Sequence, residues 1–309
     1  MVHTMHKGKA EGACAAMEEA KQGKLYVSTG RSVEQVSWDA IVLGSAPLDG
    51  AGALCAGKEA IFCADASGTI WRLNQKTMMP ESVFFGGPGI CDLCLSADEN
   101  KLYALLADAD SVVMLDSHSG RPLLLNRCGC NPSGLLSGRD VLAAAGGESG
   151  CVHLYDADTL ICTKEISMPG PVQAIAFDDR TLYALCLTAQ LDTLLVKVSE
   201  VERKMLRLDG MPGSLCVHEG WLYAATQGLL YVFDGKTLCL QRRSRVPGRP
   251  SRMIAGYNKI IMHDPLSGNL CALHANGRWQ ILAADVKSFC EGSAGFDSLA
   301  LDLQIGNAL

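Results

Sequence analysis

Apolar and polar residues alternate along most of the chain in runs of five to seven residues, separated by short polar segments. In the stretch ICDLCLSADENKLYALLADADSVVMLDSHSGRPLLLN, the runs are ICDLCLS, KLYALLAD, SVVMLD and RPLLLN. The segments between them, ADEN, DAD and SHSG, carry the Asp, Asn, Ser and Gly that tight turns require. No 10-residue helical period interrupts this pattern. The pattern predicts an all-β protein built from units of four short strands.

This four-strand unit recurs about every 39 residues, a spacing typical of one four-stranded propeller blade. A pair of residues lies in the second strand of each unit. In most units a proline precedes this pair and a polar turn residue follows it, with the same period. Seven marked units predict a seven-bladed β-propeller of antiparallel blades. The pairs are Leu25-Tyr26, Ile61-Phe62, Leu102-Tyr103, Val141-Leu142, Leu182-Tyr183, Leu222-Tyr223 and Ile260-Ile261, and the turn residues are Asn74, Asp116, Asp156, Asp234 and His274.

The segments KLYALLAD, DSVVMLDSHSGRPL, TLYALCLT and GLLYVFDGKT resemble the YVTN-type propeller family, across roughly residues 24–290. WD-repeat blades would need recurrent Trp-Asp pairs, and Trp38-Asp39 is the only one in the chain. The resemblance implies the propeller fold, and it implies no single activity because such propellers do not share one.

Blade 1 has three strands near the N-terminus, expected at Lys24–Ser28, Val33–Ser37 and Ala40–Gly44. A C-terminal strand should supply the fourth and remove the open sheet edge. We expect residues 286–290 to do so, with 299–305 as an added outer strand; an eighth blade is the alternative. We expect residues 1–23 to be an extension that is either disordered or a short helix at 10–23, residues 24–292 to form the ring, and 293–309 to form a C-terminal strand or tail packed on it.

Composition narrows the function classes. The chain has 309 residues, of which 48% are apolar and 19% charged, so it is not a disordered chain. Its net charge of −6 does not favour nucleic acid, although five arginines cluster between residues 242 and 252. No run of 18 apolar residues predicts a membrane span, and the first 23 residues lack the apolar region of a signal peptide. We expect a cytoplasmic monomer without a cofactor.

Fourteen cysteines are spread through apolar stretches, which is typical of small buried hydrophobes in a reducing compartment. Cys55, Cys94 and Cys216 share one position of the repeat and predict core filling. A metal site is the alternative, because two cysteine pairs fall in equivalent regions of blades 3 and 4 and thiolates bind zinc or iron–sulfur clusters. Its ligands would be Cys91, Cys94, Cys128 and Cys130.

The loops after the second and fourth strands of each blade share one face of a propeller, which we call the top face. Side chains from many blades can surround one ligand there. Mixed acids and arginines on these loops predict binding of a protein or a small polar ligand, although Asp is also what tight turns select. The candidates are Asp65, Asp108, Asp110, Arg127, Glu148, Asp192, Arg249 and Asp264.

Three functions stay open from the sequence. The first is a non-catalytic scaffold or binding module that uses the top face. The second is a hydrolase resembling propeller lactonases, which open cyclic esters of sugar acids; that resemblance would need His263, Glu148 and Arg249 to converge on the channel. His263 and Asp264 would then act as a base and its orienting carboxylate. The third is a cysteine-bound metal or redox protein.

Overall fold

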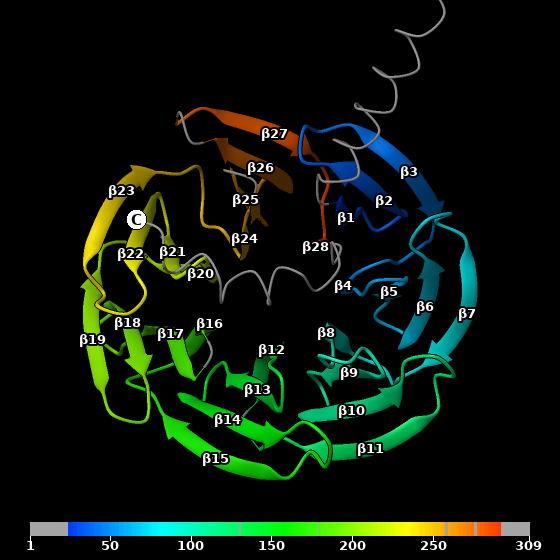
Figure 1. Cartoon of the computed structure of the whole chain (residues 1–309), viewed down its shortest axis with the longest axis horizontal. Helices are drawn as coiled ribbons and strands as arrows, with labels where there is room; N and C mark the ends of the chain where they lie inside the picture. The colour runs from blue at the N-terminus through cyan, green and yellow to red at the C-terminus, as the bar shows by residue number, and fades with distance from the viewer. Residues whose placement is uncertain (1–23, 130, 179, 257–258, 275–276, 292–309) are drawn as a thin grey trace, which may run out of the picture.

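The computed structural model describes residues 24–291 except 130, 179, 257–258 and 275–276. The helix expected at 10–23 and the strand expected at 299–305 therefore lie outside the described residues. Within them, 28 strands form seven four-stranded antiparallel sheets arranged in a ring (Figure 1). The described residues form no helix, and so none long and apolar enough to cross a membrane. The expected all-β, seven-bladed propeller is confirmed.

In every blade, four strands follow one another from the central channel outward (Figure 1). Blade 1 contains β28 (Ser288–Glu291), β1 (Lys24–Ser28), β2 (Ser32–Ser37) and β3 (Val42–Pro47). Blade 2 contains β4 (Leu54–Ala56), β5 (Ala60–Ala64), β6 (Thr69–Asn74) and β7 (Pro80–Phe85). Blade 3 contains β8 (Ile90–Leu95), β9 (Lys101–Leu106), β10 (Ser111–Asp116) and β11 (Pro122–Arg127). Blade 4 contains β12 (Pro132–Ser137), β13 (Val141–Gly146), β14 (Cys151–Asp156) and β15 (Cys162–Ser167).

Blade 5 contains β16 (Val172–Asp178), β17 (Thr181–Leu187), β18 (Thr193–Val198) and β19 (Arg203–Leu208). Blade 6 contains β20 (Pro212–His218), β21 (Trp221–Thr226), β22 (Leu229–Asp234) and β23 (Leu240–Arg245). Blade 7 contains β24 (Arg252–Gly256), β25 (Lys259–Asp264), β26 (Asn269–His274) and β27 (Trp279–Ala283). The innermost strand of each blade thus lines the channel, and the fourth lies on the circumference (Figure 1).

The core lies between neighbouring blades, because successive side chains of a strand point to opposite faces of the sheet. In β9, Tyr103 and Leu105 pack with residues of blade 4 such as Leu142. Leu102 and Leu106 of the same strand pack with residues of blade 2 such as Phe62. Each second strand is thus buried on both faces, and this explains why its sequence is apolar nearly throughout.

The C-terminal strand closes the ring. Strand β28 pairs antiparallel with β1, from Leu25 opposite Glu291 to Ser28 opposite Ser288. Phe289 is fully buried in the cluster between blades 7 and 1. The expectation that residues near 286–290 complete blade 1 is confirmed, and the described sheets number seven rather than eight.

One strand boundary in blade 1 differs from expectation. The fourth strand was expected at Ala40–Gly44, and β3 runs from Val42 to Pro47. Ala40 takes a left-handed φ of 68°, and its amide donates to the Ser37 carbonyl at 3.1 Å. The chain reversal therefore occupies the start of the expected strand. A left-handed alanine is uncommon, so the sequence alone favoured an extended conformation there.

The recurring polar residues cap the turns between the third and fourth strands. One side-chain oxygen of Asn74, Asp116, Asp156 or Asp234 accepts a hydrogen bond from the amide three residues on, at 2.7 to 3.1 Å. Hydrogen bonds from that residue lower the pKa values of the three Asp side chains below their usual range. The repeated polar residue is therefore explained by turn geometry.

Candidate functional site

An ion pair spans the central channel. Arg252 begins β24 of blade 7 and Asp92 lies on β8 of blade 3, and their Nη1 and Oδ1 atoms are 3.7 Å apart. The second oxygen of Asp92 accepts a hydrogen bond from the amide of Leu135, on the inner strand of blade 4, at 2.9 Å. Asp92 thus links three blades across the channel. The sequence did not single out Asp92, and it grouped Arg252 only with a cluster of arginines.

Thiols line the same inner strands. Cys290, Cys55, Cys94 and Cys216 lie opposite the aromatic residues Tyr26, Phe62, Tyr103 and Tyr223 of the next strand. All four cysteines belong to or pack against the apolar clusters between blades. Burial raises their pKa values, that of Cys290 to about 12, so they are neutral thiols near pH 7. The expectation of core filling for Cys55, Cys94 and Cys216 is confirmed.

The innermost strand of blade 1 carries a carboxyl group with altered acidity. Glu291 ends β28, and burial raises its pKa from 4.5 to about 7. A carboxyl group of this kind changes charge close to neutral pH.

The four cysteines of the metal alternative do not share one environment. Cys91 is exposed and is the extra residue of a β-bulge in β8. Cys94 and Cys128 pack in the apolar cluster between blades 3 and 4. Cys130 lies outside the described residues. Among the residues that the structure describes, Cys91, Cys94 and Cys128 do not come within metal-ligand distance of one another as a group.

Several top-face acids are used by the loops themselves. Asp65 accepts hydrogen bonds from the Ser67 hydroxyl at 2.7 Å and the Thr69 amide at 2.9 Å. Asp110 accepts the amides of Gly129 and Asn131, both at 2.9 Å. Asp65 thus caps its own turn, and Asp110 holds the loop between β11 and β12.

Two further acids are also engaged, and four charged residues are free. The carboxylate of Asp264 accepts the Ser267 hydroxyl at 2.9 Å, and Asp192 pairs with Arg207 at 2.6 Å. The remaining candidates are exposed, and the described part of the chain offers them no hydrogen-bond or ion-pair partner. They are Asp108, Arg127, Glu148 and Arg249.

His263 is a buried structural residue. Only 5% of it is exposed, its Nε2 lies 2.9 Å from the Val286 carbonyl, and its Nδ1 lies 3.1 Å from the Ser251 hydroxyl. Because a carbonyl only accepts, Nε2 carries the proton and Nδ1 can accept from Ser251. Burial lowers the pKa of His263, which keeps it neutral. Glu148 lies on blade 4 and Arg249 before blade 7, and neither contacts His263 through a described hydrogen bond.

A small cavity opens on the face opposite the top loops, between blades 2 and 3. It has a volume of about 200 Å³, below the roughly 300 Å³ at which small-molecule sites begin. Its polar lining includes Lys58, Arg72, Glu99 and His118. Glu99 accepts the Lys58 amide at 2.8 Å and so joins the two blades. The sequence treated these segments only as turns.

Comparison with known proteins adds support for the fold. No protein-family model matches the chain, so the resemblance to YVTN-type repeats is not confirmed by a family. No curated protein matches it either. A functionally unknown protein from Desulfotomaculum acetoxidans has a similar structure, with a TM-score of 0.73 and 14% identity, over 88% of this chain and 99% of that one.

The Kuenenia stuttgartiensis hydrazine synthase also contains a similar chain, with a TM-score of 0.63 and 12% identity, over 84% of this chain and 91% of that one. At such identities the likeness concerns the fold alone. The fold and these comparisons define the class of the protein, a seven-bladed β-propeller.

Proposed function

We propose that the protein is a non-catalytic interaction module that binds a partner protein along part of its circumference. The observation that carries this proposal is an asymmetry among the outer strands. The outer strands of blades 7, 1, 2 and 3, which we call the apolar rim, are β27, β3, β7 and β11. They follow one another around the ring (Figure 1). The outer strands of blades 5 and 6, β19 and β23, form the basic rim.

The two rims differ in how their free edges are protected. An unpaired outer strand is open to pairing with another chain, and charged side chains are a common protection. The basic rim follows this rule, with Arg203, Lys204 and Arg207 on β19 and three arginines on β23. Arg242, Arg243 and Arg245 thus lie on a largely exposed outer strand.

The apolar rim does not follow the rule. Strands β3 and β27 carry no charge, and β7 and β11 carry one each, Glu81 and Arg127. Large apolar side chains are exposed instead, including Val83 at 60% and Phe85 at 64%. The others are Val42, Leu43, Leu124, Leu125 and Ile281.

Exposed apolar side chains beside free strand edges suit an extended partner segment with apolar side chains of its own. Such a segment would add as a strand, with main-chain hydrogen bonds for affinity and side-chain contacts for specificity. The lactonase-like alternative has less support, because both ring nitrogens of His263 are engaged and it is buried. The cytoplasmic location and monomeric state expected from the sequence remain part of this proposal.

Quantitative affinity capture with matched variants tests the proposal. Val83→Lys combined with Phe85→Lys places two charges on β7. The control is Met205→Lys on β19 of the basic rim, where Met205 is an apolar residue 53% exposed. We expect the β7 variant to lose its partner at least about 10-fold and the control to retain it. Both should keep the parent melting temperature within about 1 °C, because surface changes are nearly neutral.

A top-face variant tests, in the same experiment, the competing hypothesis that the partner binds the top face. Arg249→Glu with Asp108→Lys changes two of its free charges. Lys76→Glu is the control on the opposite face, in the exposed turn between β6 and β7. If the top-face pair abolishes capture while the β7 variant retains it, the partner binds the top face and the apolar-rim proposal is wrong.

A further inference from the structure

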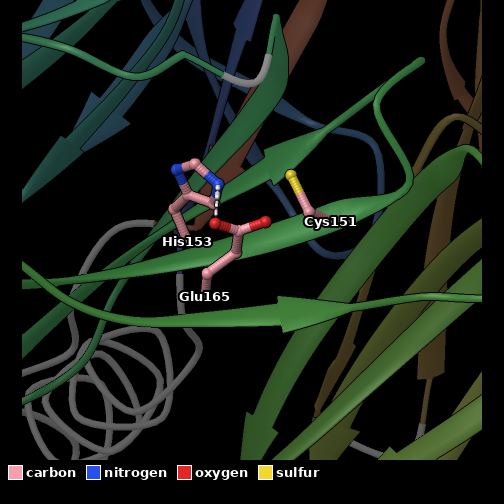
Figure 2. Close-up of side chains that lie close together, drawn as sticks. All are labelled: Cys151, His153 and Glu165. Atoms are coloured by element: carbon pink, nitrogen blue, oxygen red, sulfur yellow. Dashed lines mark ion pairs between the residues drawn. The ribbon is translucent and has the colours of Figure 1, made fainter.

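We propose that Cys151, His153 and Glu165 of blade 4 form a binding site for one zinc ion. Cys151 and His153 are alternate residues of β14 and therefore share a face of the blade. Glu165 lies on the neighbouring strand β15, directly opposite His153 in the register. One ligand atom from each residue lies within 4.8 Å of the others. Figure 2 shows the three side chains grouped on blade 4.

The site lies at the margin of the apolar cluster between blades 3 and 4. Cys151 and Tyr155 belong to this cluster, and Cys151 is 7% exposed. The His153 side chain is 12% exposed, whereas that of Glu165 is 63% exposed. Two ligands are therefore held firmly by packing, and the third is free to move toward a cation.

Hydrogen bonding fixes the orientation of the imidazole. The Tyr155 hydroxyl donates its single proton to the Cys128 carbonyl, at 3.3 Å. The Nδ1 atom of His153 is 3.2 Å from the same hydroxyl, which can only accept from it. Nδ1 therefore carries the proton of the neutral ring, and the lone pair lies on Nε2. Metal-bound histidines are usually oriented in this way by a partner of the second nitrogen.

The lone pair of Nε2 faces another acceptor. The Glu165 Oε2 atom lies 3.8 Å from it, so in the neutral state two acceptors face each other with no donor between them. The Ser149 hydroxyl lies 2.9 Å from the Cys151 sulfur, within hydrogen-bond distance. A divalent cation would bind all three acceptor atoms. A proton on Nε2 would form a hydrogen bond between His153 and Glu165 only.

The donor set selects the ion. A thiolate, an imidazole and a carboxylate together suit zinc, whereas magnesium and calcium prefer oxygen ligands alone. In a tetrahedral site with bonds of about 2.0–2.3 Å, ligand atoms are roughly 3.3–3.8 Å apart. The His153–Glu165 separation of 3.8 Å is about 0.3–0.5 Å longer than a nitrogen–oxygen pair of such a site, and Cys151 needs a shift of up to about 1.3 Å. Three protein ligands leave a fourth position for water.

Zinc titration of the reduced full-length protein tests the proposal, with a chromophoric chelator as competitor and cobalt as a spectroscopic probe. We expect Glu165→Gln and Cys151→Ala each to bind one equivalent less of tightly held zinc than the parent protein. The thiolate-to-cobalt absorption of the site should be lost in Cys151→Ala. Cys162→Ala is the matched control, because Cys162 is an exposed thiol on the same outer strand, β15. It should bind as the parent does.

Tyr155→Phe tests the positioning role of the hydroxyl. Loss of an outer-shell partner costs about 10–100-fold in metal affinity, and we expect a reduction of that size with the stoichiometry unchanged. Equal zinc stoichiometry and affinity in the parent, Glu165→Gln and Cys151→Ala proteins would overturn the proposal. So would a zinc-free parent whose His153 carries two protons at pH 7.5 by nitrogen NMR and keeps both after zinc is added.

Discussion

Truncation of Phe289 tests the closure of the ring. Phe289 lies on β28 and is fully buried between blades 7 and 1, where Leu25, Val27, Ile261 and Leu270 belong to the same cluster. Replacing a buried Phe with Ala removes its transfer free energy and leaves a cavity, which together cost about 3–5 kcal/mol. We therefore expect Phe289→Ala to lower the free energy of unfolding by that amount.

This loss converts to a measurable shift in melting temperature. The unfolding entropy is about 2.1 cal/mol/K per residue, or roughly 0.65 kcal/mol/K for a chain of 309 residues. A loss of about 3–5 kcal/mol then lowers the melting temperature by about 5–8 °C. Differential scanning calorimetry measures the shift directly.

The matched control is Ile281→Ala on β27, whose side chain is 60% exposed. A surface change of this kind should move the melting temperature by less than about 1 °C. Deletion from Ser288 onward removes β28 entirely, exposes the edge of β1 and should cause aggregation. A Phe289→Ala protein that melts within about 1 °C of the parent, or a control that loses as much, would refute the closed-ring account.

Three further predictions concern protonation and thiols. The pKa of His263 is lowered from 6.5 in the folded chain, so the unfolded chain binds a proton at higher pH than the folded chain does. The free energy of unfolding therefore decreases as the pH falls below about 6.5. Urea unfolding between pH 7.5 and 5.5 should show a smaller decrease for His263→Gln than for the parent. The pKa of Glu291 is raised from 4.5 to about 7, so its burial opposes folding increasingly as pH rises between these values. Glu291→Gln should therefore raise the melting temperature at pH 8 but not at pH 4, and equal shifts at both would contradict the burial. Of the twelve described cysteines, Cys91, Cys162 and Cys239 are exposed, and brief alkylation with peptide mapping should label Cys162 and Cys239 first. Cys91 should react more slowly, although its residue is exposed, because partial desolvation of its thiol and the adjacent Asp92 carboxylate raise its pKa to about 11. Faster labelling of Cys55 would refute this order.

The fold could be predicted from the sequence because each blade places the same physical requirements on equivalent residues. A second strand buried on both faces must be apolar, and the tight turn between the third and fourth strands needs a capping side chain. Leu102-Tyr103 on β9 and Asp116 at the end of β10 are examples. The period at which such residues recur predicts the length of one blade. The expected start of the fourth strand of blade 1 was wrong because the left-handed Ala40 has no signature in the sequence.

The candidate sites were less predictable, because they depend on which strands the ring brings together. Asp92 and Arg252 are 160 positions apart and meet only when blades 3 and 7 face each other across the channel. The grouping of Cys151, His153 and Glu165 depends on the exact register of β14 and β15. Conversely, the top-face acids were visible in the sequence, but Asp65 caps its own loop and Asp110 binds amides of the neighbouring loop.

Site-specific photo-cross-linking tests the proposed interaction surface most directly. A photoreactive phenylalanine analogue would replace Val83 on the apolar rim and, in a matched protein, Met205 on the basic rim. Both side chains are exposed on outer strands, at 60% and 53%. The account predicts that one partner protein is cross-linked in cells from position 83 and not from position 205. Cross-linking of the same partner from position 205 alone, or from an equivalent probe at Arg249 alone, would contradict it.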